Sequence, residues 1–285
     1  MTAAAHGTVD LHMHSTASDG SATPAAVVAA AHAAGLAAIA LTDHDTLAGV
    51  REARAAAAPL GLRVIAGVEL SAVDAGGAEI HVLGLHITRP EPLERALDVF
   101  RTARRERALE IVERLNALGV PVTREAVLAE AGDAAIGRPH VARALMAGGW
   151  VKDFREAFDR WLGAGRPAFV EKRRLSMPEA FALIHDAGGL AVYAHPGYDG
   201  TRERVAAFAA EGMDGLEVRH PGHSASETSR LAALAEQLGL LPSGGSDWHG
   251  AAEGSRVVGC MNVPAAWLER QEARVRDRLA HAVPA

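Results

Sequence analysis

Short apolar runs alternate with helical segments along the first ninety residues of the chain. A helix is predicted to begin at Pro24 with Thr23 as its N-cap and to end at Gly35, and a second helix follows to about Leu60. Apolar runs that predict strands lie at residues 8–12, 37–41, 63–70 and 79–87. This alternation of strand and helix is typical of a parallel sheet or a β/α barrel.

The alternation stops near Pro90 and Pro92. Apolar residues then recur at helical spacing from Leu93 onward, until Gly119 and Pro121 end that helix. Three more helical segments are predicted at residues 124–131, 139–147 and 153–162, with no strand pattern until about Ala168. We therefore expect residues 93–170 to form a helical insertion, which divides a barrel domain into residues 1–92 and 171–285.

Beyond the insertion the strand and helix alternation resumes. Ser176 and Glu179 form a capping-box pattern that opens a helix, which ends at Gly188. Further strands are predicted at residues 190–194, 215–218 and 240–243. Together with the earlier strands these give about seven strands outside the insertion.

Composition excludes several classes of protein. The formal net charge of -6 argues against a broad, non-specific nucleic-acid surface. Cys260 is the only cysteine, so one chain cannot form a disulfide or a cysteine-based zinc site. No apolar run is long enough to span a membrane, and the first eight residues lack the features of a secretory signal. We expect a cytoplasmic protein, and nothing in the sequence indicates a protein partner.

Histidine is the anomaly, with 14 residues that are unevenly placed and often adjacent to acids. His12 and His14 come at the end of the first strand, and residues i and i+2 of a strand point to the same face. Most of the others lie at or just after strand ends, which meet on one face of a β/α barrel. We predict nine metal ligands at this face: His12, His14, Asp19, His44, Glu69, His81, His195, Asp247 and His249.

Metal chemistry accounts for these residue types. Imidazole with carboxylate suits zinc, manganese or iron, whereas magnesium prefers oxygen ligands. Nine candidates exceed the needs of one ion, so two or three divalent ions sharing a carboxylate are expected, and Glu69 is a plausible bridge. Paired ions are typical of phosphoester hydrolysis, where they lower the pKa of a bound water and neutralise phosphoryl charge. For Asp19 the alternative is a turn residue in a short loop.

These same residues resemble the motifs of the PHP family, which is named for polymerase and histidinol phosphatase. The similar segments run essentially from end to end: Val-Asp-Leu-His-Met-His-Ser at 9–15, Ser-Asp-Gly at 18–20, Leu-Thr-Asp-His-Asp at 41–45, Gly-Val-Glu at 67–69, His81, Ala-His-Pro at 194–196 and Gly-Ser-Asp-Trp-His at 245–249. The resemblance implies a distorted seven-stranded β/α barrel. It also implies that every expected ligand position is filled.

Within that family the resemblance implies three metal sites. The first would use His12, His14, Glu69 and Asp247; the second would share Glu69 and add His81 and His195; the third would use Asp19, His44 and His249. In the insertion, Gly-Arg-Pro-His-Val-Ala-Arg at 137–143 resembles the branch of 3′,5′-nucleoside bisphosphate phosphatases and RNA 5′-end exonucleases.

Substrate contacts are predicted from the chemistry of a few further side chains. Arg138 and His140 are candidates for a second phosphate, because the guanidinium fork matches phosphate oxygens and a helix start attracts anions. For Arg138 the alternative is a pairing within the insertion. His223 is a candidate phosphate contact or proton donor, and Asp247 is expected to act in catalysis as a ligand.

The sequence thus predicts a metal-dependent phosphomonoesterase whose insertion selects the substrate. The expected substrate is a 3′,5′-bisphosphonucleotide such as phosphoadenosine phosphate, which would lose its 3′-phosphate. The alternatives are a phosphodiesterase that trims RNA or short oligonucleotides from the 5′ end, histidinol phosphate as a substrate, and a non-catalytic metal-binding module. The intact ligand set disfavours the last of these.

Overall fold

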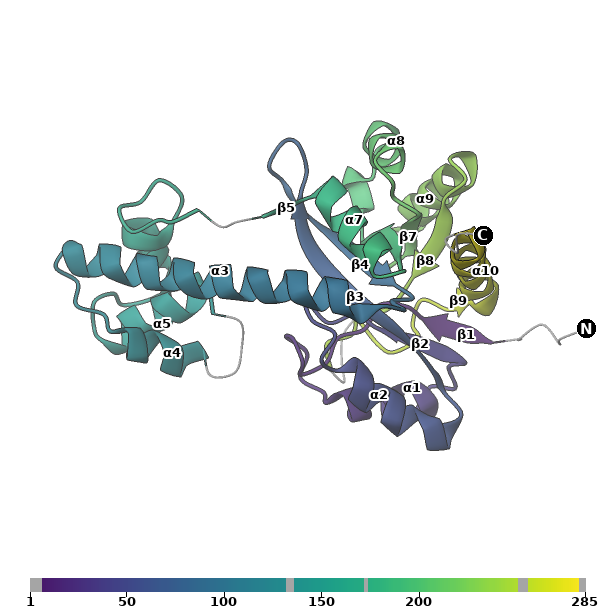
Figure 1. The fold of residues 1–285 in the computed structure, drawn as a ribbon, viewed down its shortest axis with the longest axis horizontal. Helices are drawn as coiled ribbons and strands as arrows, with labels where there is room; N and C mark the ends of the chain where they lie inside the picture. The colour runs from purple at the N-terminus through teal and green to yellow at the C-terminus, as the bar shows by residue number, and fades with distance from the viewer. Residues whose placement is uncertain (1–6, 132–135, 172–173, 251–255, 282–285) are drawn as a thin grey trace, which may run out of the picture. The chain divides into compact units, whose positions relative to one another are not determined.

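The computed structural model describes residues 7–131, 136–171, 174–250 and 256–281 (Figure 1). The chain divides into two compact units, one of Met1–Glu94 with Leu175–Ala285 and the other of Arg95–Arg174. We call them the barrel unit and the insertion unit. Each has its own apolar core.

The barrel unit is built on one mixed sheet. Its strands follow the order β8-β7-β6-β4-β3-β2-β1-β9, and β5 pairs with β3. Their bounds are β1 Thr8–Asp10, β2 Ala38–Leu41, β3 Arg63–Val73, β4 Glu79–Leu85, β5 Leu175–Ser176, β6 Leu190–Tyr193, β7 Gly215–Arg219, β8 Leu241–Gly244 and β9 Val263–Pro264. All seven strands expected outside the insertion are therefore present, and β5 and β9 are short additions.

One strand runs against the expected parallel direction. β4 is antiparallel to both β3 and β6, because β3 continues to Val73 and only the turn from Asp74 to Ala78 separates it from β4. A parallel connection would need a dozen or more residues. Glu69 consequently lies inside β3 rather than at its end. The reversal places the start of β4, with His81, at the same end of the barrel as the ends of the parallel strands.

The two sides of the sheet meet just beyond β1 and β8. The Leu11 N–H donates to the Gly244 carbonyl at 3.1 Å, the Asp247 N–H to His12 at 2.9 Å, and the His14 N–H to Trp248 at 2.9 Å. These bonds nearly close the sheet into the distorted barrel that the sequence predicts. They also bring the segment after β1 against the segment after β8.

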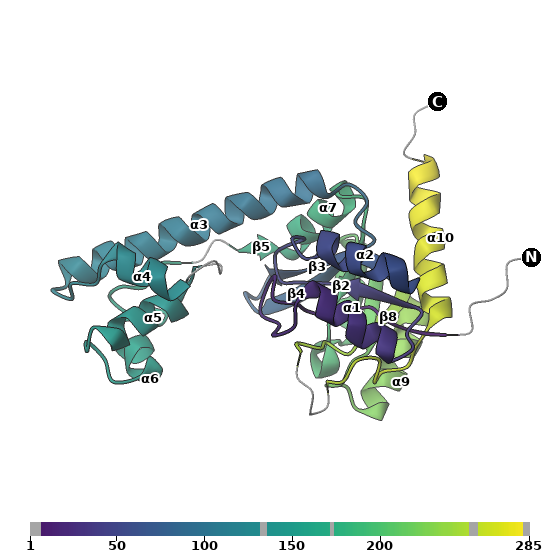
Figure 2. The same cartoon turned by 90° about the horizontal axis from the view of Figure 1, so that it is seen from below.

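Helices cover the outside of the barrel (Figures 1 and 2). α1 and α2 pack on β2 and β3, α7 on β4 and β6, α9 on β7 and β8, and α10 on β1 and β8. Their bounds are α1 Pro24–Ala33, α2 Val50–Ala57, α7 Met177–Asp186, α8 Arg202–Ala210, α9 Ala225–Gln237 and α10 Ala265–His281. The predicted caps are confirmed, since Thr23 accepts from Ala26 N and Ser176 forms a capping box with Glu179.

The insertion unit is helical. It contains most of α3 Pro90–Ala117, which begins three residues earlier than predicted because proline is well tolerated in a first helical turn. The remaining elements are α4 Arg124–Ala131, α5 Arg138–Ala147, α6 Phe154–Ala157 and the turn of π-helix Phe158–Leu162. Their apolar faces bury Ile111, Leu115, Val141, Leu145 and Leu162. In the described part of the chain, no helix has the length and apolarity to cross a bilayer.

Candidate metal centre

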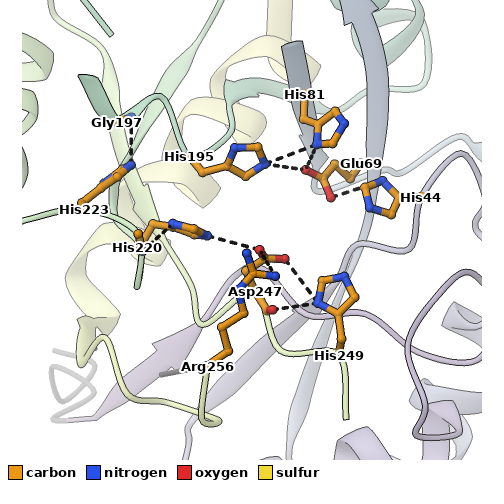
Figure 3. Close-up of a pocket in the computed structure, with 11 residues that line it drawn as sticks. His44, Glu69, His81, His195, Gly197, His220, His223, Asp247, His249 and Arg256 are labelled. Atoms are coloured by element: carbon orange, nitrogen blue, oxygen red, sulfur yellow. Dashed lines mark hydrogen bonds and ion pairs between the residues drawn. The ribbon is translucent and has the colours of Figure 1, made fainter. Parts of the chain in front are cut away.

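The predicted ligands come together at one end of the barrel, where the segments after β1, β2, β6 and β8 meet β3 and β4 (Figure 3). They form three overlapping groups, and within each group the donor atoms lie within 4.8 Å of one another. The groups are His12, His14, Glu69 and Asp247; His44, Glu69 and His81; and His14, Asp19, His44 and His249. His195 joins them through contacts with Glu69 and His81.

The first group is completely buried and has the dimensions of a coordination sphere. His12 Nε2 lies 3.1 Å from His14 Nε2, 3.2 Å from Glu69 Oε2 and 3.4 Å from Asp247 Oδ1. His14 Nε2 lies 3.2 Å from each of the same two oxygens. Ligands about 2.0 Å from one tetrahedral ion are about 3.3 Å apart. The four donor atoms therefore fit a single ion with little rearrangement.

The second group forms around the other oxygen of Glu69. Oε1 of Glu69 lies 3.0 Å from His81 Nδ1 and 3.0 Å from His195 Nε2, and these two nitrogens are 3.3 Å apart. Oε2 of the same carboxylate faces His12 and His14, and His44 Nδ1 lies 3.4 Å from it. The two oxygens of Glu69 thus face different sets of imidazoles, which is the arrangement of a bridging carboxylate.

The third group is more open to solvent. Asp19, with 54% of its side chain exposed, lies 3.5 Å from His249 Nε2 and 3.7 Å from His44 Nε2. His249 Nδ1 donates to the Asp247 carbonyl at 2.8 Å, so Nε2 is the ring nitrogen that faces Asp19. The hydrogen bond with His249 is the main cause that lowers the pKa of Asp19 to about 2, and in return it raises the pKa of His249.

His14 belongs to two of the groups. Its Nε2 enters the first, while its buried Nδ1 has no hydrogen-bond partner among the described residues and lies 3.7 Å from Asp19 Oδ1. A buried polar atom without a partner costs roughly 1–3 kcal/mol. An orphaned imidazole nitrogen beside a carboxylate is the environment that a bound cation would complete.

The carboxylates and imidazoles of the centre shift one another's pKa values. Burial opposes ionisation of Glu69 and Asp247, but the surrounding imidazoles outweigh it and hold the pKa of both carboxyls well below the ordinary range. Burial likewise opposes protonation of His12, yet Glu217 and Glu69 raise its pKa well above the usual value. Anionic carboxylates beside imidazoles form a donor set that suits zinc, manganese or iron.

Glu217, in β7, is a residue that the sequence prediction missed. Its buried carboxylate accepts from His12 Nδ1 at 3.0 Å through Oε1 and from the His195 backbone N–H at 2.6 Å through Oε2. The first bond orients the ring so that Nε2 points into the first group. A signal was present in the sequence, since a lone acid within the apolar strand 215–218 requires a buried partner.

Two further side chains contact Asp247 through its second oxygen. His220 Nδ1 accepts from Gly222 N at 3.0 Å, so its Nε2 carries the proton and donates to Asp247 Oδ2 at 3.2 Å. Arg256 Nη1 lies 2.9 Å from the same oxygen. Asp247 therefore directs Oδ1 toward His12 and His14, while His220 and Arg256 contact Oδ2.

Two ligands have unusual backbone conformations. His195 and Asp247 have φ values of 30° and 50°, in the left-handed region that non-glycine residues rarely adopt. Their neighbours hold these conformations, since Glu217 binds the His195 N–H and His12 accepts the Asp247 N–H. Such strain is typical of positions where the fold fixes the direction of a functional side chain.

A cavity of about 320 Å³ opens over the centre, lined by ligands together with Gly197, His220, Gly222, His223 and Arg256. His223 Nε2 accepts from Gly197 N at 3.1 Å and its Nδ1 donates to the Val218 carbonyl at 3.0 Å. Burial lowers the pKa of His223. Its proposed role as a proton donor stays a prediction, and it requires one of these two hydrogen bonds to break.

Arg138 and His140 belong to the insertion unit and have partners there. Arg138 Nη1 donates to the Leu162 carbonyl at 3.1 Å, and the guanidinium lies 5.4 Å from the ring of Phe158 and 5.7 Å from that of Phe169. His140 Nδ1 accepts from Gly137 N at 2.9 Å across the first turn of α5. Their roles toward a second phosphate stay predictions.

The chain is similar to several known proteins. The family model of the PHP domain matches residues 10–168. A 5′-3′ exoribonuclease of Haemophilus influenzae is 41% identical over 84% of this chain and 89% of its own length. A 3′,5′-nucleoside bisphosphate phosphatase of Chromobacterium violaceum is also 41% identical, over 88% of this chain and 90% of its own.

A solved structure from Bifidobacterium adolescentis, described as a metal-dependent phosphoesterase, is similar over 95% of this chain and 96% of its own, with a TM-score of 0.72 and 34% identity. The family resemblance and the barrel fold expected from the sequence are both confirmed. The residues gathered at the mouth of the barrel can bind metal, and the activity is that of a phosphoric ester hydrolase. The chain belongs to the PHP domain family.

Proposed function

We propose that the chain removes the 3′-phosphate from 3′,5′-bisphosphonucleotides, such as phosphoadenosine phosphate, with two or three divalent ions of manganese, iron or zinc. The observation that carries the proposal is the orientation of the Glu69 carboxylate. Its Oε2 faces His14 and its Oε1 faces His195. Adjacent ions about 3.5–4 Å apart suit the hydrolysis of a phosphate ester. The similarity to the Chromobacterium phosphatase supports this substrate class.

Bound ions would acidify water and neutralise charge on the phosphoryl group. The ligands would be His12, His14, Glu69 and Asp247 at the first site, His81 and His195 with Glu69 at the second, and Asp19, His44 and His249 at the third.

The protein's own contribution is to fix these donor atoms in place. Glu217 holds the ring of His12 and the backbone of His195, and His220 holds Asp247. His223 lines the cavity and is the candidate for protonating the leaving oxygen. Because these groups are already oriented, their dipoles do not have to rearrange during the reaction.

The insertion unit would select the substrate. Arg138 and His140 would contact the second phosphate, because guanidinium pairs well with phosphate oxygens. If so, Arg138→Gln should raise KM for a 3′,5′-bisphosphonucleotide by more than it raises KM for the matching 3′-mononucleotide. An equal change for both substrates would remove Arg138 from this role.

The direct test is release of inorganic phosphate from a panel of phosphorylated metabolites, with metal analysis of the same sample. We expect turnover of 3′,5′-bisphosphonucleotides to exceed that of single phosphomonoesters, including histidinol phosphate. Metal-loaded protein that leaves every bisphosphonucleotide intact would overturn the substrate proposal. Metal binding without turnover of any phosphate ester would favour a non-catalytic module.

A second candidate is removal of nucleotides from the 5′ end of short RNA. The observation in its favour is the equal identity to the Haemophilus exoribonuclease. Defined oligonucleotides of increasing length separate the two candidates. A rate that holds or rises from two to about eight nucleotides would indicate the exonuclease, and a rate confined to mononucleotides would indicate the phosphatase.

A further inference from the structure

Arg256 differs from every other residue described at the cavity wall. The charged and titratable side chains among those lining residues are imidazoles and carboxylates, apart from this one guanidinium. Guanidinium keeps its charge at any physiological pH, whereas imidazole does not. Arg256 is therefore the fixed positive charge that the chain itself supplies to this part of the cavity.

Its position relative to the metal ligands is set by Asp247. Nη1 of Arg256 lies 2.9 Å from Asp247 Oδ2 (Figure 3). Oδ1 of the same carboxylate lies 3.2 Å from His14 Nε2. Arg256 thus contacts a member of the first group of predicted ligands, and both residues line the cavity.

The guanidinium also has donors to spare. It carries five N–H bonds, and the contact with Asp247 is the one ion pair or hydrogen bond it makes with the described residues. Its side chain is 48% exposed and lines the cavity. Arg138, by contrast, spends a donor on the Leu162 carbonyl and stacks on two aromatic rings.

We propose that Arg256 binds the phosphoryl group that is hydrolysed, donating to oxygens of that group while one N–H remains on Asp247. The inference rests on the proposed phosphoesterase function of this site. A planar fork of donors matches the tetrahedral face of a phosphate. Charge on the phosphoryl oxygens is greatest before and during transfer, so a fixed cation there favours both binding and reaction.

A purely structural role for Arg256 makes a different prediction. If the guanidinium served only to hold Asp247, its loss would weaken metal binding. His220 donates to the same Oδ2 at 3.2 Å, however, so Asp247 keeps a donor when Arg256 is replaced. The proposal therefore expects phosphate binding to fall while metal content is retained.

The test compares Arg256→Gln and Arg256→Lys with the unchanged protein, all loaded with manganese. Arg63→Gln is the matched control, because Arg63 is 54% exposed and pairs with Glu272, a surface carboxylate outside this cavity. Three quantities are measured: metal bound per chain, the inhibition constant of inorganic phosphate, and kcat and KM on a bisphosphonucleotide.

For Arg256→Gln we expect unchanged metal content, a rise of about tenfold or more in the inhibition constant of phosphate, and a loss of about 100-fold or more in kcat/KM. Arg256→Lys should recover part of the loss, since it keeps the charge without the fork. The control should match the unchanged protein. Calorimetric titration with inorganic phosphate gives the same comparison without any substrate.

Two results with the variant would overturn the proposal, and a third concerns the unchanged protein. One is Arg256→Gln protein that binds phosphate and turns over substrate normally; the other is a loss of metal that parallels the loss of activity. If the unchanged protein hydrolyses no bisphosphonucleotide but binds phosphate through Arg256, the substrate proposal fails and this inference stands. Absence of phosphate binding by the manganese-loaded, unchanged protein would defeat the inference.

Discussion

The Nδ1 atom of His12 lies 3.0 Å from Oε1 of Glu217, and the second oxygen of that carboxylate accepts the His195 N–H at 2.6 Å. One buried side chain of β7 thus fixes a ligand that follows β1 and another that follows β6. Both bonds require an acceptor. Glu217 therefore determines ring orientation in one group and backbone position in another, although it does not face the cavity.

Replacement of Glu217 by glutamine should weaken metal binding by roughly 10- to 100-fold. The amide has nearly the same size, but it has one acceptor oxygen where the carboxylate has two, so one of the two N–H donors would face an NH2 group. Metal content after dialysis against a graded series of chelator concentrations gives the affinity.

The matched control for this change is Glu236→Gln on the exposed surface of α9, which should leave metal content unaltered. A Glu217→Gln protein with the metal affinity of the unchanged protein would show that the ligands hold their orientation without this carboxylate.

Gly245 is expected to tolerate no side chain. A Cβ atom there would lie 2.4 Å from His12 N and Cβ and 2.8 Å from Asp10 Oδ1, where real Cβ atoms do not approach. Gly245→Ala should therefore push apart the segments after β1 and β8, destabilise the fold by about 2 kcal/mol and lower metal occupancy. Thermal unfolding and metal content measure both effects.

Gly76→Ala is a suitable control for the glycine prediction, because a Cβ atom at Gly76 meets only the Asp74 carboxylate, whose nearest atom would be 3.3 Å away. A melting temperature for Gly245→Ala equal to that of the control would contradict the close approach seen between Gly245 and His12.

The gathering of the nine candidate ligands at one end of the barrel was predictable, because strand ends can be identified in the sequence and barrel topology brings those ends together. The direction of each strand, and the place of a residue along it, were harder to infer. The turn from Asp74 to Ala78 is too short for a crossover, so β4 runs antiparallel and brings its first residues, with His81, to that end. Glu69 similarly faces the centre from within β3 instead of from its end.

Residues that surround the predicted ligands were not predictable in the same way. Glu217 lies among apolar residues of a strand, and Arg256 lies in a loop beyond the last motif, so neither has a spacing that indicates metal chemistry. Each is identified only in the structure, by its contact with a predicted ligand that is not adjacent in sequence. Partners distant in sequence are fixed by tertiary packing, which a periodic pattern does not encode.

Asp214 should make the stability of the barrel unit depend on pH. Burial opposes its charge, but hydrogen bonds from His185 and Arg278 outweigh this effect and lower the pKa of Asp214. Because the folded pKa lies below the unfolded value of about 3.9, the stabilisation is present above about pH 4 and is lost as pH falls through the folded pKa. Asp214→Asn should cost about 2 kcal/mol at pH 7.

Urea unfolding at pH 7, 5 and 3.5 in the same buffers checks this prediction. The difference in free energy of unfolding between the unchanged protein and Asp214→Asn should be constant from pH 7 to 5 and shrink at pH 3.5. Asp186→Asn, an exposed change at the end of α7, serves as the control. A difference that grows toward low pH would have the wrong sign for a carboxyl with a lowered pKa.

The bridging position of Glu69 leads to a prediction about metal stoichiometry. Its Oε2 faces His12 and His14 and its Oε1 faces His81 and His195, so Glu69→Ala removes a donor from two groups at once. We expect this variant to lose about two ions per chain, measured by elemental analysis after removal of free metal. His249→Ala should lose one ion at most, because His249 contributes to the third group alone.

The comparison between these two variants distinguishes a shared carboxylate from independent sites. Independent sites would make Glu69→Ala and His249→Ala lose the same number of ions, since each change would then remove one ligand of one ion. Circular dichroism must show that Glu69→Ala still folds, because its removal leaves several buried imidazoles without a carboxylate partner. A folded Glu69→Ala protein that retains all but one ion would contradict the bridge, even if its activity were lost.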